Sequence, residues 1–396
     1  MINKPLKIGI FSDSYHPYVS GVVLSIETFS RELARLGHEI YIFAPEYPQV
    51  KGQQEENIFR FPSFHTPFNS EFYIALPLTW TARKYVSDIG LDVIHTHSPF
   101  TMGQVGKRIA RYLGIPLVFT YHTLYDQYVH YVPLVGQFTK KGMIKYTRNY
   151  CNCCDLVITP TDVIRDLIKE RGVTTPVLAI PTGIYPERFQ NGDPTFLEEK
   201  FGIPREKKVL LFVGRIGKEK NLAFLLRAFS YIATQEKDAV LVLVGSGPEE
   251  GTLRLLAGDL GLKDRVIFTG RISPELISGV YKSADIFVFP SVTETQGLVL
   301  VEAMAAGMPV VAKAAFGSLA MVQDGITGYL CRGDEEEFAE KTLALLKDPD
   351  LKKTMALAAL KRAQELSADK MALRLESAYY GLINRKTRRI SGGESV

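Results

Sequence analysis

Two glutamates lie eight residues apart in the segment SVTETQGLVLVEAMAAGMPVV, which spans residues 291–311. Glu294 falls in a loop predicted directly after the apolar strand DIFVFPS, and Glu302 falls within a helix predicted from Gly297 to Ala306. A buried carboxylate is costly unless it pairs with a cation or accepts hydrogen bonds. The free N–H groups at the start of that helix favour a phosphate group, whereas a carboxylate accepts hydrogen bonds from neutral hydroxyl groups. The segment therefore predicts a phosphate site with sugar hydroxyls on both sides of it; acids that only cap backbone amides are the alternative.

The segment LLFVGRIGKEKNL offers the positive charge that such a site needs. Gly214 allows the backbone to approach a ligand closely, Arg215 presents a planar fork of donors, and Lys220 adds a point charge five residues later. An arginine and a lysine that converge are suited to a diphosphate. The alternative is an exposed turn with ordinary surface cations.

Strands must position these loops, and short apolar runs alternate with helical patterns along the whole chain. Most runs are continuously apolar, which is typical of parallel strands covered on both faces. Seven lie in the first half and six in the second: KIGIFSD, EIYIFAP, NIFRFP, DVIHTH, PLVFTYH, DLVITPT and PVLAIP, then KVLLFVG, VLVLVG, VIFTG, IFVFPS, PVVAK and TGYLC. Ligands of such sheets bind beyond the carboxyl ends of the strands. The pattern predicts an α/β protein with two doubly wound, Rossmann-like domains.

The predicted domain boundary is a stretch rich in proline, glycine and charge at residues 185–208, YPERFQNGDPTFLEEKFGIPREKK. It separates an N-terminal domain of residues 1–190 from a C-terminal domain of residues 191–373. A last helix is predicted from about Ala368 to Arg385, followed by a basic tail.

Composition excludes several classes of protein. With 46% hydrophobic and 23% charged residues, and no apolar stretch of the roughly 18 residues that cross a bilayer, the chain is expected to be soluble and globular. No signal segment precedes the first strand, which predicts a cytoplasmic location. Cys151, Cys153 and Cys154 crowd together without a second pair of ligands at zinc spacing, so reduced structural thiols are expected. A net charge of +4 is too small to indicate a nucleic-acid partner.

Three elements together resemble the retaining nucleotide-sugar glycosyltransferases of the GT-B fold, family four. They are the pair Glu294 and Glu302, the GRxxxxKN element at residues 214–221, and PTGIYPERF at residues 181–189. The resemblance covers essentially the whole chain. It implies two Rossmann-like domains that face each other across a cleft, with the C-terminal helix of about residues 374–396 returning to the N-terminal domain.

The resemblance also implies a role for each donor-side residue. Arg215 and Lys220 are expected to grip the donor diphosphate. Glu294 is expected to contact the transferred sugar, and Glu302 the nucleoside ribose. The remaining expected donor contacts are glycines or backbone groups, with the base near Arg271: Gly21, Gly214, Arg271, Ile272, Gly297, Leu298 and Val299.

On the acceptor side, His122 follows the strand PLVFTY directly and is expected at its carboxyl end. The resemblance assigns a histidine at this place to the reacting sugar, through its backbone and ring rather than as a nucleophile. His97 is expected nearer the acceptor than His95, which is read as a polar cap, and no carboxylate spacing supports a metal site at these histidines. The loop TYHTLYDQYVHY supplies the other expected acceptor contacts: Tyr121, Tyr125, Tyr128 and His130.

The aromatic-rich loop of residues 121–131 resembles most closely that of the diacylglycerol glucosyltransferases, which attach glucose to a membrane lipid. Residues 101–150 hold seven basic residues and one acidic residue, so their local charge is about +6. Each basic residue near an anionic leaflet contributes about 1 kcal/mol of binding. We therefore expect helices of about residues 105–113 and 138–150 to dock on the inner face of the cell membrane; the alternative is a solvated basic face.

The expected reaction is transfer of a hexose, namely glucose from UDP-glucose, to a lipid such as 1,2-diacylglycerol with the α configuration retained. No acceptor-side carboxylate has an obvious claim to act as a nucleophile, so the departing diphosphate is expected to take the proton of the acceptor hydroxyl. No metal or other cofactor is expected, because two cations and a helix start stabilise the diphosphate. The alternatives are a soluble, phosphoinositol or polysaccharide acceptor, a nucleotide-sugar epimerase, and a catalytically idle binder of membrane surfaces.

Overall fold

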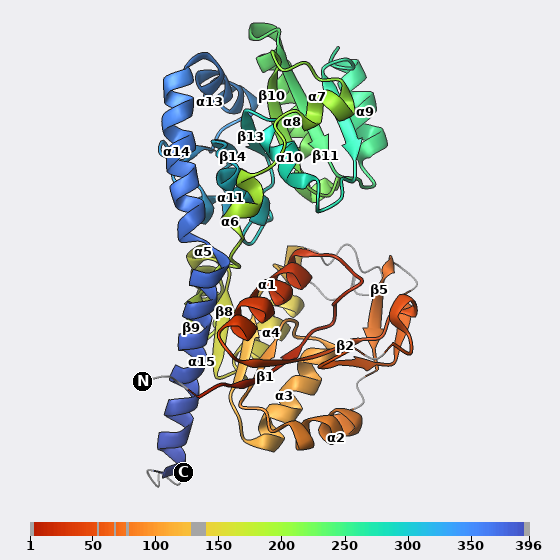
Figure 1. Cartoon of the computed structure of the whole chain (residues 1–396), viewed down its shortest axis with the longest axis vertical. Coiled ribbons are helices and arrows are strands. Elements are labelled where there is room, and N and C mark those ends of the chain that lie inside the picture. Colours follow the sequence, from red (N-terminus) through yellow and green to blue (C-terminus); the bar gives the residue numbers. More distant parts are fainter. Residues whose placement is uncertain (1–3, 54, 67–68, 77–78, 128–139, 392–396) are drawn as a thin grey trace. The chain divides into compact units, whose positions relative to one another are not determined.

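The chain folds into two compact units in the computed structural model, which describes residues 4–53, 55–66, 69–76, 79–127 and 140–391 (Figure 1). Unit 1 comprises residues 1–183 and 368–396, and unit 2 comprises residues 184–367. The boundaries expected from the sequence, after residue 190 and near residue 374, lie a few residues further along the chain.

Unit 1 is built on a seven-stranded parallel sheet in the order β3-β2-β1-β6-β7-β8-β9. Its strands are β1 (Lys7–Phe11), β2 (Glu39–Pro45), β3 (Ile58–Phe61), β6 (Val93–Thr96), β7 (Leu117–Thr120), β8 (Leu156–Thr159) and β9 (Val177–Ala179). The chain order reverses between β1 and β6, so the switch point of the sheet lies there. The seven strands predicted in the first half are confirmed, but the antiparallel hairpin of β4 (Ser63–Thr66) and β5 (Asn69–Ala75) was missed.

Helices connect the strands of unit 1, and their ends follow local sequence signals. The helical segments among the described residues of this unit are α1 (Gly21–Arg35), η1 (Pro48–Val50), α2 (Thr79–Ile89), α3 (Thr101–Leu113), η2 (Tyr125–Gln127), α4 (Lys140–Cys151), α5 (Asp162–Glu170) and α15 (Ala368–Ser391). Ser20 is the N-cap of α1, and its side chain accepts a hydrogen bond from the backbone N–H of Val23 at 3.3 Å. Gly37, with a φ of +94°, follows its end.

The C-terminal helix α15 belongs to unit 1, as the GT-B expectation requires. Its apolar residues lie in the same buried cluster as the first strands and α1, and α1 packs directly against α15. The α15 members of this cluster are Met371, Ala372, Leu375, Tyr379 and Leu382. The last helix is therefore part of the N-terminal core rather than an appendage.

Unit 2 is built on a six-stranded parallel sheet in the order β12-β11-β10-β13-β14-β15. Its strands are β10 (Lys208–Val213), β11 (Ala239–Val244), β12 (Val266–Gly270), β13 (Ile286–Phe289), β14 (Val310–Lys313) and β15 (Gly328–Cys331). All six match the runs predicted from the sequence. Here the chain order reverses between β10 and β13, which makes the loops after these two strands the expected place for a ligand.

The helical segments of unit 2 surround that sheet, and its largest buried cluster spans both strands and helices. They are α6 (Pro186–Gln190), α7 (Phe196–Phe201), η5 (Lys218–Lys220), α8 (Leu222–Gln235), α9 (Glu250–Asp259), α10 (Ile277–Lys282), α11 (Leu298–Ala305), α12 (Phe316–Met321), α13 (Glu335–Lys347) and α14 (Pro349–Glu365). The helix predicted from Gly297 to Ala306 is α11, with Gly297 at its N-cap in the left-handed region (φ +78°).

Candidate active site

The loops that follow β10 and β13 meet at the switch point of unit 2. Lys220, the last residue of the short helix η5, donates a hydrogen bond from Nζ to Oε1 of Glu294 in the loop after β13. The hydroxyl of Ser291 also reaches across, to the carbonyl oxygen of Glu219 at 3.2 Å. Arg215 lies on the same loop as Lys220, directly after Gly214, and is exposed. The structure thus brings Lys220 and Glu294 into contact and places Arg215 on the loop that carries Lys220.

Glycine is required where the loop after β11 passes the loop after β10. Gly245, at the end of β11, has a φ of +130°, and a Cβ atom there would lie 1.9 Å from the carbonyl oxygen of Gly214. The N–H of Gly245 in turn donates to the carbonyl oxygen of Gly270 at 2.9 Å, which draws the end of β12 into the same region. The carboxyl ends of β10, β11 and β12 are therefore held together by backbone contacts that a side chain would prevent.

The backbone of the Glu294 loop is fixed by the start of α12. The carbonyl oxygen of Glu294 accepts a hydrogen bond from the N–H of Gly317 at 2.8 Å. A Cβ atom on Gly317 would lie 2.5 Å from the carbonyl oxygen of Gln296, which is itself buried. The next residues turn into α11, so the N–H groups of Leu298 and Val299 lie in its first turn, where a helix leaves its N–H groups without helical partners.

Glu302 lies one turn further along α11, and its carboxylate is held by a residue that the sequence analysis did not select. The hydroxyl of Tyr281 donates to Oε2 of Glu302 at 2.7 Å. Burial raises the pKa of Glu302, while the Tyr281 hydrogen bond and the charge of Arg188 oppose that rise. Burial and the charge of Glu302 raise the pKa of Tyr281 well above its usual value, so Tyr281 keeps its proton and acts as the donor.

The residues expected near the base lie in the loop after β12. Arg271 donates from Nε to the hydroxyl of Ser246 at 2.7 Å, and Ser246 itself follows β11. Ile272 is partly buried against the core of unit 2. Arg188, from the PERF segment, donates to the carbonyl oxygen of Pro274 in the same loop. Apart from Glu302, which lies one turn into α11, every donor-side residue expected in unit 2 thus lies in a loop or helix start at the carboxyl end of the sheet.

Three histidines lie together at the carboxyl ends of β6 and β7 in unit 1. Nδ1 of His97 lies 2.8 Å from Nε2 of His122, while His95 contacts the hydroxyl of Tyr379 and that of Thr120, both at 2.6 Å. Burial lowers the pKa of His95 and of His122 to about 3 and that of His97 well below its usual value. All three rings are therefore neutral near pH 7. His97 is buried against His122, and His95 is buried within β6.

The aromatic loop after β7 is anchored by an ion pair. Tyr121 is buried and packs edge-on against Tyr125, with ring centroids 5.7 Å apart. Asp126, also buried, accepts hydrogen bonds from both terminal nitrogens of Arg171 at 2.9 and 3.2 Å. Two of the acceptor contacts expected from the sequence, Tyr128 and His130, lie outside the described residues. Gly21 is the first residue of α1, at the carboxyl side of β1.

An acid that the sequence analysis did not select lies at the switch point of unit 1. Asp13 follows β1 and accepts hydrogen bonds from the backbone N–H of Met102 at 2.9 Å and from the hydroxyl of Ser98. Burial raises the pKa of Asp13, against the effect of these two hydrogen bonds. The carboxylate joins the end of β1 to the start of α3. Its only sequence signal is its position directly after the first apolar strand.

Among residues 4–53, 55–66, 69–76, 79–127 and 140–391, no three His, Cys, Asp or Glu side chains are arranged to hold a metal ion. Burial raises the pKa of Cys151 to about 12 and that of Cys154 well above its usual value, so both are thiols near pH 7. Within the same ranges, no helix has the length and apolar character needed to cross a bilayer.

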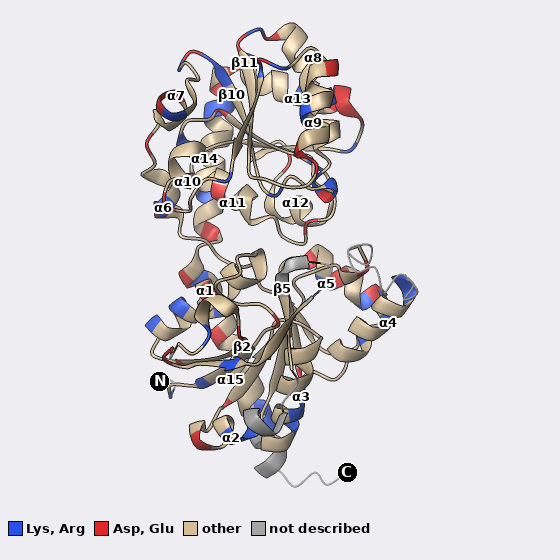
Figure 2. Ribbon diagram, turned by 90° about the vertical axis from the view of Figure 1, so that its right-hand side faces the viewer, with Lys and Arg blue, Asp and Glu red and all other residues tan. Residues whose placement is uncertain are grey.

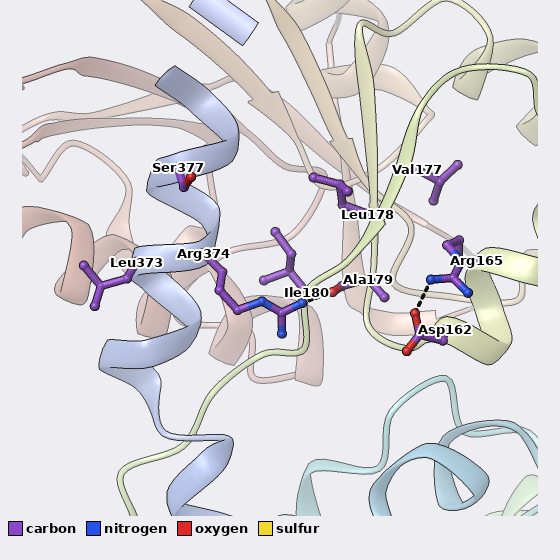
Figure 3. Close-up of a pocket in the computed structure, with 9 residues that line it drawn as sticks. All are labelled: Asp162, Arg165, Val177, Leu178, Ala179, Ile180, Leu373, Arg374 and Ser377. Carbon is purple, nitrogen blue, oxygen red and sulfur yellow. Dashed lines mark hydrogen bonds and ion pairs between the residues drawn. The ribbon is translucent and has the colours of Figure 1, made fainter. Parts of the chain in front are cut away.

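A pocket of about 490 Å³ lies elsewhere in unit 1, between α5, β9 and α15 (Figure 3). Both of its arginines are engaged within the protein. Arg165 pairs with Asp162 and Asp166, and Arg374 donates to the carbonyl oxygen of Ala179 at 2.7 Å. None of the residues expected in the donor or acceptor sites lines this pocket.

Known protein families and individual proteins are similar to the chain along most of its length. Residues 19–188 match the family profile described as Glycosyltransferase Family 4, and residues 193–362 match the one described as Glycosyl transferases group 1. The chain is 34% identical over 385 residues to the alpha-monoglucosyldiacylglycerol synthase of Streptococcus pneumoniae, covering 96% of this chain and 86% of that protein. It is 30% identical over 401 residues to the synthase of the same name from Acholeplasma laidlawii, covering 98% and 100%.

Solved structures show the same architecture. Anabaena HepE in complex with UDP-glucose aligns with a TM-score of 0.77 at 20% identity, covering 95% of this chain and all of that one (100%). Sucrose-phosphate synthase from Thermosynechococcus elongatus aligns with a TM-score of 0.78 at 23% identity, covering 96% and 100%. At these identities the likeness shows the fold, and the predicted GT-B architecture is confirmed.

Proposed function

The chain belongs to glycosyltransferase family 4, and from this premise we propose that it transfers glucose from UDP-glucose to a membrane lipid acceptor, 1,2-diacylglycerol, with retention of the α configuration. The lipid acceptor is supported by the names of the synthases of Streptococcus pneumoniae and Acholeplasma laidlawii. The donor is supported by HepE, which was solved with UDP and with UDP-glucose. The observation that carries the proposal is the junction of loops at the switch point of unit 2, where Lys220 meets Glu294.

In the proposed donor complex, Arg215, Lys220 and the first N–H groups of α11 stabilise the diphosphate. The carboxylate of Glu294 binds hydroxyls of the transferred sugar and steadies the ammonium of Lys220. Glu302 binds the ribose, and the backbone at Arg271 and Ile272 receives the base. All of these groups lie in unit 2, either on loops at the carboxyl ends of parallel strands or in the first half of α11, which follows one of those loops; ligands of such sheets bind there.

In the proposed reaction, the bond between the anomeric carbon and the phosphate oxygen breaks while the acceptor oxygen bonds to the anomeric carbon from the same face. The proton of the acceptor hydroxyl passes to the departing phosphate oxygen. The negative charge that develops on the diphosphate is then the main target for stabilisation, and fixed cations and amide dipoles provide it. His122, whose pKa is lowered to about 3 by burial, is neutral and contributes a hydrogen bond to the reacting sugar rather than a positive charge.

The decisive assay incubates the protein with labelled UDP-glucose, UDP-galactose and GDP-mannose, each with and without diacylglycerol vesicles. We expect a labelled glycolipid only with UDP-glucose and vesicles, at a rate that EDTA does not change. Label in a soluble or phosphoinositol product would show that the acceptor is not diacylglycerol. An altered nucleotide sugar in the absence of vesicles would indicate an epimerase.

Glu302→Ala is expected to raise the KM for the donor by about tenfold or more and to lower kcat less, because it removes hydrogen bonds to a part of the donor that does not react. Glu302 accepts these bonds when ionised. Because burial raises its pKa, the wild-type donor KM should begin to rise at a higher pH than for an ordinary carboxyl group as the pH falls. Steady-state kinetics between pH 5 and pH 8 check this: the variant should lose that pH dependence, and an unchanged KM would remove Glu302 from the donor site.

Activity is expected to rise with the fraction of anionic lipid in the vesicles and to fall with added salt, if α3 and α4 dock on the membrane. Figure 2 shows lysines and arginines on both helices. Those whose side chains are exposed are Arg108, Arg111, Lys140, Lys141 and Lys145. Vesicle sedimentation at two salt concentrations measures binding directly.

A matched pair of triple variants distinguishes an effect of the basic surface of α4 from an effect of the net charge of the protein. Reversing the three exposed lysines of α4 to glutamate should abolish the response to anionic lipid. Reversing three exposed lysines of unit 2, which changes the net charge equally, should leave the response in place. The unit 2 control residues are Lys237, Lys263 and Lys353. Equal behaviour of both triple variants would contradict docking through α4.

A further inference from the structure

The PERF segment is part of the family resemblance, yet the proposed donor contacts leave its role open. It forms α6 in unit 2, which packs against both α10 and α11. Phe189 is buried, and its ring lies edge-on to that of Tyr281, with centroids 5.6 Å apart and an interplanar angle of 83°. This is a favourable arrangement for two aromatic rings. α6 therefore fixes the ring of Tyr281 from one side.

Tyr281 is fully buried, and its hydroxyl is directed at a single acceptor. A second aromatic residue, Phe287 of β13, lies with its ring centroid 5.9 Å from that of Tyr281. The hydroxyl donates to Oε2 of Glu302 at 2.7 Å, a short hydrogen bond to a charged group. A buried tyrosine ring held by two aromatic neighbours has little freedom to turn, so this hydrogen bond fixes the carboxylate as well.

Glu302 has two carboxylate oxygens in different situations. Oε2 is held by Tyr281, whereas no described residue donates a hydrogen bond to Oε1. The side chain is only partly buried. Arg188, also from α6, acts on Glu302 through its charge while its guanidinium donates to the carbonyl oxygen of Pro274. The PERF segment thus supports both Glu302, which is expected to contact the ribose, and the loop after β12, which is expected to contact the base.

We propose that Tyr281, supported by Phe189 of the PERF segment, is a positioning residue that aims Oε1 of Glu302 at the ribose hydroxyls of the donor nucleotide. This inference rests on the proposed nucleotide-sugar function. Tyr281 touches neither sugar nor phosphate; it acts by keeping the Glu302 carboxylate in one rotamer, as supporting residues do for other binding groups. The structural role of the PERF segment is then to hold the nucleoside end of the site.

The test compares binding of nucleotides that differ only in their ribose. UDP, 2′-deoxy-UDP and 3′-deoxy-UDP are titrated by calorimetry into the wild-type protein, Tyr281→Phe and a control, Tyr329→Phe, which removes a tyrosine hydroxyl from β15 in the same unit. Tyr281→Phe should bind UDP about tenfold more weakly but lose less affinity for at least one deoxy analogue, so that the preference for ribose shrinks. Tyr329→Phe should behave as the wild type does.

The outcomes separate this inference from the proposed function. If the wild type prefers UDP to the deoxy nucleotides and Tyr281→Phe keeps the full preference, the positioning role is wrong and the donor site stands. If the wild type does not bind UDP, the proposed donor is wrong. If it binds all three nucleotides equally, the assignment of Glu302 to the ribose is wrong. The positioning role fails in both cases. Phe189→Leu keeps the hydroxyl but loosens the ring; it should reduce the preference partially and serves as the test should Tyr281→Phe not fold.

Discussion

Lys220→Ala is expected to lower kcat by at least about a hundredfold, as for the loss of one donor to a developing negative charge. Lys220 is held at the switch point of unit 2 by Glu294, and the two side chains are 16% and 23% exposed. A cation fixed in this way needs little reorganisation when charge develops on the diphosphate. Steady-state turnover of UDP-glucose with diacylglycerol vesicles measures the effect, and a near-normal rate would discredit the assignment.

Two further variants show whether the loss arises at the diphosphate. Lys218→Ala removes an exposed lysine from the same short helix and should leave kcat within about twofold of the wild type, as expected for an exposed side chain away from the site. The double variant Lys220→Ala with Glu294→Ala removes both partners of the ion pair. If the double variant were more active than Lys220→Ala alone, the loss would come from an unpaired carboxylate rather than from missing contact with the diphosphate.

Gly245→Ala is expected to destabilise unit 2 by about 3 kcal/mol or more, since it adds both a backbone clash and a conformation that alanine rarely adopts. The added Cβ atom would lie 1.9 Å from the carbonyl oxygen of Gly214, at a φ of +130°. For a unit of this size the melting temperature should fall by about 6 to 12 °C. Differential scanning calorimetry of the full chain measures it.

Gly251→Ala is the matched control, and it is expected to stabilise the protein rather than destabilise it. Gly251 lies in α9, and a Cβ atom there would meet nothing within 4 Å. Alanine should stabilise this helix by about 0.4–1 kcal/mol, because it restricts the unfolded chain and favours the helix. Equal melting temperatures for the two variants would show that the close approach of the strand ends at Gly245 does not matter for stability.

Much of the fold was accessible from the sequence, because parallel strands covered on both faces leave continuous apolar runs. The thirteen strands of the two large sheets all coincide with runs predicted from the sequence, most of which are continuously apolar. The β4–β5 hairpin was missed because its first strand, SFHT, has a single apolar residue and its second, NSEFYIA, begins with three polar residues. The ends of the two units were placed only approximately, since the composition of the linker does not show where its last packing contact lies.

The site was predictable as a set of loops but not as a set of contacts. Lys220 and Glu294 were chosen individually from their positions after strands, yet their pairing joins residues 74 positions apart. Asp13 and Tyr281 were missed because their partners lie 85 and 21 positions away, and no local pattern marks a residue that acts through such a partner. The pairing of His97 with His122 is of the same kind. Local sequence predicts at which strand end a residue lies. Which side chain that residue contacts depends on the complete fold.

Unit 1 cannot complete its core until the end of the chain has been synthesised, because α15 supplies part of that core. Unit 2 is a contiguous segment that has left the ribosome before Tyr379 reaches its place beside His95. The half that is made first is therefore finished last, contrary to the common order in which N-terminal domains fold first. A truncation from the C-terminus that removes Tyr379 would therefore destabilise unit 1, which begins the chain, and leave unit 2 intact, although unit 2 is nearer to the truncation in sequence.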